Sequence, residues 1–343
     1  MTHTRRALFL GIMALALIQG ALYLSLVPPW DHYDEPTHFE YGWLIANRLR
    51  LPQKDDQDPV LRREISASML EEGFQYEHMI HPRLLPGEGP VQIGISELVH
   101  PPLYYILIAI PLRLVRHADV RTQLYVARAV SLLLYLITVA CAWGVGEEVT
   151  QRSTEKTQRD TEETQRSTKE TESKSTKESA PARPLCSLFS SVSLCASSGG
   201  WLPSALCVPF FLSLILVLLP GFVDVMTAVN SDAGAVAAFS VLLWAAVRAI
   251  RRHAEGKRVL WSLIGCTLAA LVCPFVKNTA SVSLLLLPLV WVWALVRPWR
   301  SLWDRRTRIL LCIACLLVAG VALGLIFAWG NAAQWVHLGI QSR

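Results

Sequence analysis

The polar segment at residues 28–100 lacks cysteine, and the long apolar runs of this sequence contain few charged residues. Residues 28–100 contain no cysteine, which excludes a disulfide framework there. Only 17% of all residues are charged, and Lys and Arg gather at the ends of the apolar runs. The net charge of +5 therefore does not indicate nucleic-acid binding, because basic residues beside apolar runs are typical of membrane topology signals.

Long apolar runs dominate what is present. Hydrophobic residues make up 52% of the chain, and the mean hydropathy is +0.37. Crossing about 30 Å of hydrocarbon takes roughly 20 residues, so the sequence predicts an all-α, polytopic transmembrane helical protein. A weaker run at 102–115 is short and contains Pro111 and Arg113. The predicted spans are 7–27, 124–145, 201–219, 233–250, 259–275, 280–296 and 309–329.

Basic residues predict the direction of the first helix. Arg5 and Arg6 precede it, which places the N-terminus in the cytoplasm. The run is longer than the apolar part of a secretion signal, and Ser25 to Pro28 form a poor cleavage site. We therefore expect an uncleaved anchor in the cell inner (plasma) membrane.

The number of membrane crossings then predicts the side of the membrane on which each polar loop lies. Basic clusters at 248–258 and 297–308 are also cytoplasmic signals, so an even number of crossings must precede the first of them. Five apolar segments precede it, and the weakest, 102–115, is predicted to be a juxtamembrane or re-entrant helix on the outer side. The loop 220–232, with its VNSDA motif, then shares the outer face with the 28–52 segment and with Lys277.

The predicted organisation also includes one segment that is not apolar. Residues 151–179 are rich in Thr, Ser, Glu and Lys and are predicted not to form a packed core. The expected units are a first transmembrane helix (1–27), an extracytoplasmic loop with amphipathic and juxtamembrane helices (28–123), a transmembrane helix (124–146), a disordered cytoplasmic insertion (147–200), further transmembrane helices (201–329) and a short extracytoplasmic tail (330–343).

The segment at 28–52 carries the strongest indication of chemistry. Asp34 and Glu35 stand directly before Pro36, which suits the first turn of a helix. The two carboxylates could simply complement the helix dipole. Phe39, Trp43 and Ala46 fall on one face, which predicts an interfacial amphipathic helix. Capping does not account for the aromatic and imidazole side chains nearby, so a carboxylate pair acting on a lipid-borne anionic substrate is the other interpretation.

Five further residues are candidate substrate contacts, each with a structural alternative. His38 and Tyr41 follow the acidic pair, and His100 begins the HPPLYY motif, whose prolines and tyrosines could equally start a helix and form an aromatic belt. Asp232 lies at a helix start that Asn230 or Ser231 could cap. Lys277 could bind a phosphate or extend its side chain towards water.

In this order, the DEP motif, HPPLYY, ARAVSLLLYLITV and VNSDA resemble the GT-C superfamily of membrane glycosyltransferases. The nearest resemblance is to family 39 enzymes, the protein O-mannosyltransferases and lipid A aminoarabinose transferases, and to a related branch of bacterial membrane proteins. It covers roughly residues 7–150 and 201–290. The resemblance implies inverting transfer of a sugar from a polyprenyl-phosphate donor to a lipid, glycan or protein acceptor on the extracytoplasmic face.

The resemblance also implies roles for individual residues. The first-loop acidic pair corresponds to Asp34 and Glu35, with Asp34 as the base that deprotonates the acceptor hydroxyl. The second-loop acid corresponds to Asp232, which would orient the acceptor or hold a divalent metal ion, the one cofactor considered. The rival interpretations are a transporter or flippase for lipid-linked saccharides, against which the lack of charge inside the apolar runs argues, and an inactive, truncated homologue.

Overall fold

The computed structural model describes residues 3–32, 34–53, 56–73, 91–172, 204–255 and 260–296. Every regular element in these ranges is a helix, and they contain no strand, so the predicted all-α class is confirmed. The elements are α1 (His3–Leu26), α2 (Glu35–Arg48), α3 (Pro59–Glu71), α4 (Leu103–Leu114), α5 (Val120–Glu172), α6 (Ser204–Leu218), α7 (Pro220–Thr227), α8 (Ser231–Ala254), α9 (Leu260–Val276), the 3₁₀ helix η2 (Asn278–Val282) and α10 (Ser283–Val296).

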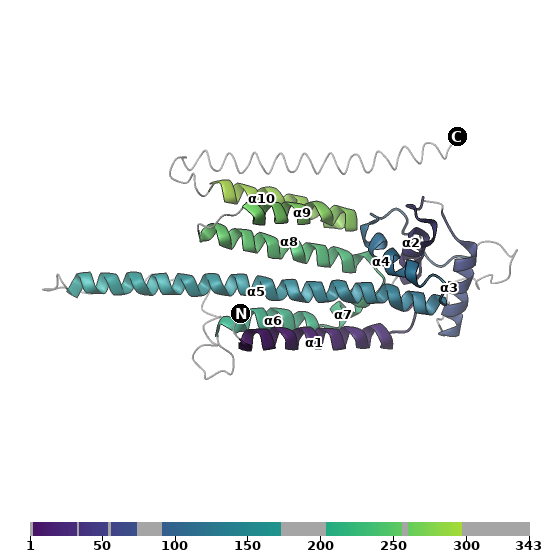
Figure 1. The fold of residues 1–343 in the computed structure, drawn as a ribbon, viewed down its shortest axis with the longest axis horizontal. Helices are drawn as coiled ribbons and strands as arrows, with labels where there is room; N and C mark the ends of the chain where they lie inside the picture. Colours follow the sequence, from purple (N-terminus) through teal and green to yellow (C-terminus); the bar gives the residue numbers. More distant parts are fainter. Residues whose placement is uncertain are drawn as a thin grey trace.

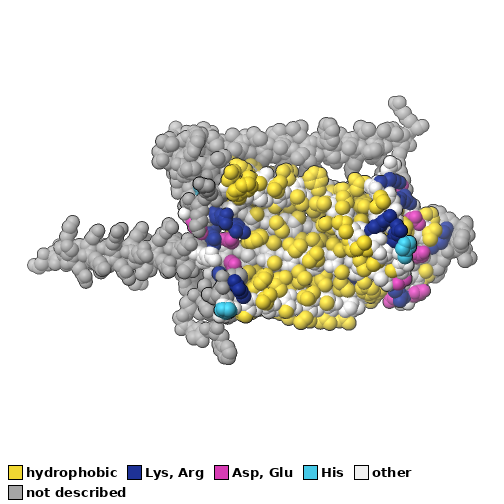
Figure 2. Space-filling model, viewed as in Figure 1, with side chains coloured by type: hydrophobic (Ala, Val, Ile, Leu, Met, Phe, Trp, Pro, Cys, Tyr) yellow, Lys and Arg dark blue, Asp and Glu magenta, His cyan; other side chains and the backbone are white. Residues whose placement is uncertain are grey.

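The long helices lie side by side in a bundle (Figure 1), with an apolar belt between two charged ends (Figure 2). Among the described residues, three helices are long and apolar enough to cross a membrane, namely His3–Leu26, Val120–Gln151 and Ser231–His253. The segments Cys207–Leu218 and Pro220–Thr227, bent by 71° at their junction, would make a fourth as one broken span. The chain is therefore a polytopic membrane protein. The runs expected at 259–275 and 280–296 form shorter helices, and 309–329 lies outside the described residues.

Helix α5 is the central element of the bundle. It packs against α1, α6 and α8, and α8 packs in turn against α9. Gly146 of α5 allows the close approach of α6, because a Cβ at this position would collide with the backbone of Pro209. The core of buried side chains extends along this bundle and into the segments at one end of it.

The same helix corrects the expectation for residues 147–200. Backbone helix continues without interruption to Glu172, where the composition predicted disorder. Glu, Lys, Gln and Arg are good helix formers, and a helix that is already nucleated extends one residue at a time without a further nucleation cost. Residues 173–200 lie outside the described part of the chain.

Helices α2, α3 and α4 cover one end of the bundle, called the α2–α4 end below (Figure 1). Helix α2 begins after Asp34 with Pro36 in its first turn, as predicted. It is not an interfacial helix, however. Phe39 and Ala46 are buried, but so are His38, Glu40 and Tyr41 on other faces, because α3 and α4 pack against it. An ion pair between Arg62 Nε and Glu40 Oε1, 2.7 Å long and almost fully buried, ties α3 to α2.

Of two further segments, one agrees with the prediction and the other differs from it. Helix α4 has 12 residues, too few to cross a bilayer, which agrees with the prediction that 102–115 does not span. The expected loop at 220–232 is largely helix α7, which starts at Pro220 in a first-turn position. Asn230 then caps α8, since its side-chain oxygen accepts a hydrogen bond from the backbone N–H of Asp232 at 2.9 Å.

Candidate functional site

Glu35 forms a buried ion pair with Arg128 at the α2–α4 end. Arg128 donates from Nε to Oε1 at 2.9 Å and from Nη2 to Oε2 at 2.7 Å, and neither side chain is exposed to solvent. The backbone N–H groups of Trp30 and Val229 donate to the same carboxylate at 3.1 and 3.2 Å. Four donors therefore occupy the Glu35 carboxylate, which fixes its position.

Arg128 has further partners that join distant segments. Its guanidinium donates to the backbone carbonyls of Leu24, Val27 and Pro28 at 2.8 to 3.2 Å. These carbonyls lie at the C-terminal end of α1, where a helix leaves acceptors without partners. The pair of Arg128 with Glu35 thus connects α5, the end of α1, the start of α2 and the link before α8. Nothing in the local sequence around Arg128 indicated this pairing.

Asp34 differs from its neighbour in having no such partners. Its backbone is left-handed, with φ 54° and ψ 14°, and its carbonyl accepts hydrogen bonds from the N–H groups of Thr37 and His38. The carboxylate makes no hydrogen bond or ion pair with any side chain or backbone group in the described ranges, and the residue is half-buried. A non-glycine residue in this backbone region costs roughly 1 kcal/mol or more, and such strain is concentrated at functional sites.

Aromatic and imidazole side chains of α2 pack against α4 and the HPPLYY segment. The Tyr41 ring stacks on Tyr105 with centroids 3.8 Å apart, and His38 Nδ1 lies 2.8 Å from the Tyr105 hydroxyl. The Tyr41 hydroxyl donates to the carbonyl of His100 at 3.1 Å. His38 and Tyr41 are thereby held against α4 and the HPPLYY segment, which lie 59 or more residues further along the chain.

His100 pairs with a carboxylate that the sequence interpretation missed. Its Nε2 lies 2.5 Å from Oε2 of Glu97, three residues earlier. Its Nδ1 is buried and has no hydrogen-bond partner among the described residues. The spacing of three residues in the SELVH motif is a signal that could have suggested the pair, although it did not indicate that Glu97 would be mostly buried.

Asp232 and Lys277 meet across 45 residues. Lys277 Nζ lies 2.6 Å from Asp232 Oδ1, with side chains 19% and 45% exposed. Asp232 is in the first turn of α8 and Lys277 precedes the 3₁₀ helix after α9. The lysine was expected to bind a phosphate or to extend into water, and the structure adds a third arrangement, an ion pair with a neighbouring acid.

Several of these charged groups act on the same two side chains, Glu97 and His38. Burial raises the pKa of Glu97, the Asp34 and Asp232 carboxylates raise it further, and His100 and Lys277 oppose them. Burial likewise lowers the pKa of His38 to about 3, with His100 and Lys277 adding to the effect. His38 is therefore neutral at physiological pH.

The structure thus brings together all seven residues that the sequence singled out, although they play different parts. Glu35 is enclosed by donors, whereas Asp34, His100, Asp232 and Lys277 keep some exposure. No group of three His, Cys, Asp or Glu side chains within the described ranges is arranged to hold a metal ion. Asp34 and the pair of Asp232 with Lys277 therefore carry the accessible charge of the site.

In comparisons with protein-family models, curated proteins and solved structures, nothing matches this chain.

Proposed function

We propose that this protein transfers a sugar from a polyprenyl-phosphate donor to an acceptor hydroxyl at the outer face of the inner (plasma) membrane. The observation that carries the proposal is the Asp34 carboxylate, which has no partner among the described groups and sits on a left-handed backbone. Like Asp232 and Lys277, it lies near enough to Glu97 to affect the pKa of that carboxyl. A free carboxylate in that setting is suited to general-base chemistry.

The orientation rests on the basic residues at the start of the first helix and at the end of α8, although Arg113, Arg116 and Arg121 at the α2–α4 end argue mildly against it. Arg5, at the start of α1, pairs with Glu147, and Arg251, near the end of α8, pairs with Glu148. These residues lie at the end of the bundle opposite to α2, α3 and α4 (Figure 1). Because basic residues favour the cytoplasm, we infer that the N-terminus is cytoplasmic and that the α2–α4 end is extracytoplasmic.

In the proposed reaction, Asp34 accepts the proton of the acceptor hydroxyl. The oxygen forms a bond to the anomeric carbon of the donor sugar, the bond from that carbon to the phosphate oxygen breaks, and polyprenyl phosphate leaves with the bonding electrons. General-base catalysis of this kind contributes typically about 10²- to 10⁴-fold. The configuration at the anomeric carbon inverts, because the attack and the departure take place on opposite faces.

The other residues have supporting parts in this proposal. Lys277 would stabilise the negative charge on the departing phosphate by exchanging its contact with Asp232 for one with a phosphate oxygen. Asp232, released from that contact, would orient the acceptor. Glu35 would act as a positioning residue, because its attachment to Arg128 fixes the backbone that carries Asp34.

The proposal is tested by incubating the purified chain in nanodiscs with a panel of radiolabelled polyprenyl-phosphate sugars and a mixed acceptor extract. We expect labelled product from at least one donor, with the inverted anomeric configuration. The variant Asp34→Asn should abolish this product, whereas Glu64→Gln should not. Glu64 is an exposed carboxylate on α3, at the same end of the protein, and so controls for a loss of surface charge. Equal product formation by Asp34→Asn and the wild type would refute the proposal.

A further inference from the structure

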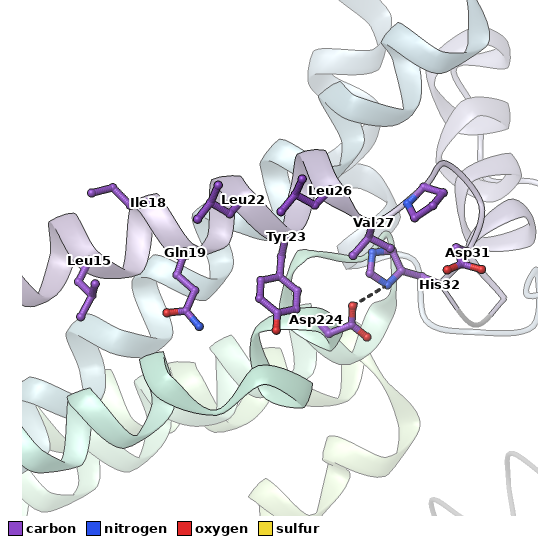
Figure 3. A pocket seen from close by; sticks show the side chains of 11 residues that line it. Leu15, Ile18, Gln19, Leu22, Tyr23, Leu26, Val27, Asp31, His32 and Asp224 are labelled. Atoms are coloured by element: carbon purple, nitrogen blue, oxygen red, sulfur yellow. Dashed lines mark ion pairs between the residues drawn. The ribbon is translucent and has the colours of Figure 1, made fainter. Parts of the chain in front are cut away.

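A cavity lies along α1 and ends at His32, whose pKa is affected by Glu35 and Arg128 of the neighbouring site. It has a volume of about 600 Å³ and lies beside the second half of α1, reaching the loop that follows this helix and α7 (Figure 3). Leu15, Leu22 and Leu26 line its long wall, and Asp31, His32 and Asp224 lie at one end. None of the residues assigned to sugar transfer lines it.

The apolar wall has the length of one membrane leaflet. From Leu15 to Leu26 the helix rises about 16 Å, at about 1.5 Å per residue. This is about half of the roughly 30 Å hydrocarbon layer. The three leucines are 37% to 74% exposed, so the described chain covers them only in part. A wall of this kind fits an extended acyl chain whose head group lies at the level of the loop after α1.

The polar end of the cavity can accept hydrogen bonds but supplies no positive charge. His32 Nδ1 lies 3.4 Å from Asp224 Oδ1, and the Asp224 side chain is 43% exposed. Burial lowers the pKa of His32, with Arg128 adding to the effect and Glu35, Asp224 and Asp31 opposing it, so the ring is neutral at pH 7. Its Nε2 is buried and has no hydrogen-bond partner among the described residues. Asp31 is exposed.

The other polar residues of the cavity do not alter this balance. Gln19 and Tyr23 are neutral, and the described lining residues include no Lys or Arg. Two carboxylates without a cation would repel a bare phosphate and attract a protonated amine.

We propose that this groove binds a membrane lipid with an amine-bearing head group, its acyl chain lying along α1 and its ammonium between Asp31 and Asp224. The acyl chain accounts for the exposed leucines, and the ammonium supplies the positive charge that the described lining residues lack. This is a lipid site in its own right, and it does not depend on the proposed sugar transfer.

The test uses the full purified chain and native mass spectrometry with two lipids of identical acyl chains, phosphatidylethanolamine and phosphatidylglycerol. We expect the wild type to retain phosphatidylethanolamine about tenfold better, the scale of two partly exposed charge pairs. The double variant Asp31→Asn with Asp224→Asn should lose this preference while still binding both lipids weakly. Leu22→Trp, which fills the groove, should lose the binding of both.

Three results would overturn the proposal. Equal retention of the two lipids by the wild type would show that the amine is not recognised. An unchanged preference in the double variant would show that the two carboxylates do not bind it. Displacement of the lipid by free ethanolamine at a similar concentration would show that the apolar wall contributes nothing. The variant Asp34→Asn should retain the lipid like the wild type, so a failure of the sugar-transfer proposal is distinguishable from a failure of this one.

Discussion

Replacing Arg128 by methionine should be among the most damaging single changes in this protein. The substitution leaves the Glu35 carboxylate fully buried with only two of its four donors, the backbone N–H groups of Trp30 and Val229. It also leaves three backbone carbonyls at the end of α1 without their donor. Breaking a buried pair by removing one partner costs roughly 3–5 kcal/mol, and we expect a loss in this range.

The partner variant and a surface pair provide the controls. Glu35→Gln should also be destabilising, but the double variant should lose about 2 kcal/mol less than the sum of the two single variants, because neither charge is then left unpaired. Arg121 is on the same helix as Arg128 and pairs with Glu71 and Glu72 at the end of α3. Its side chain is 40% exposed, and those of Glu71 and Glu72 are 68% and 25% exposed, so Arg121→Met breaks pairs that water screens. It should therefore cost less than about 1 kcal/mol.

The free energy of unfolding can be measured by titrating the protein with SDS in mixed micelles. Reaction of the buried Cys141, Cys266 and Cys273 thiols with a fluorogenic maleimide reports the loss of structure. Equal stability of Arg128→Met and Arg121→Met would refute the argument. So would additive effects of the two substitutions in the double variant, because additivity would mean that the two charges do not depend on each other.

Two further predictions concern pH and topology. Between pH 7.5 and pH 5.0 the free energy of unfolding of the wild type should fall by about 2 kcal/mol more than that of His38→Gln. His38 takes up a proton near pH 6.5 in the unfolded chain and only near pH 3 in the folded chain, so this contribution to stability is present above pH 6.5 and is lost as pH falls. His32 adds a change of the same sign to both proteins. Equal pH profiles of the wild type and His38→Gln would contradict the burial of a neutral His38. A cysteine at the exposed Thr279 should react with an impermeant maleimide in intact spheroplasts and one at the exposed Thr4 should not, and the opposite pattern would reverse the proposed topology.

Much of the fold could be predicted because it depends on local patterns. Apolar runs long enough to cross a bilayer gave the all-α membrane class, and Pro36 gave the start of α2. The alternative that Asn230 caps α8 is also observed. The parity argument brought the VNSDA motif and Lys277 to the end that carries Asp34, and the structure places them there together.

The features that the sequence did not predict depend mostly on contacts between residues that are far apart in the chain. Arg128 and Glu35 are 93 residues apart, and no pattern around either indicates the other. The same holds for Arg62 with Glu40, whose ion pair buries α2 instead of leaving it at the interface. The helix beyond residue 147 was missed for a different reason, because its composition cannot support a core, although an existing helix can extend through it without one.

The most direct test of the central claim separates proton transfer from donor binding. In single-turnover experiments with the donor that the panel identifies, Asp34→Asn should lower the transfer rate by about 10²-fold or more while changing donor affinity only a few-fold, because the amide keeps the shape but cannot accept the proton. Lys277→Met should instead weaken the binding of the donor, by about 1.5–3 kcal/mol if it contacts the phosphate. An Asp34→Asn protein with a wild-type rate of transfer would contradict the account.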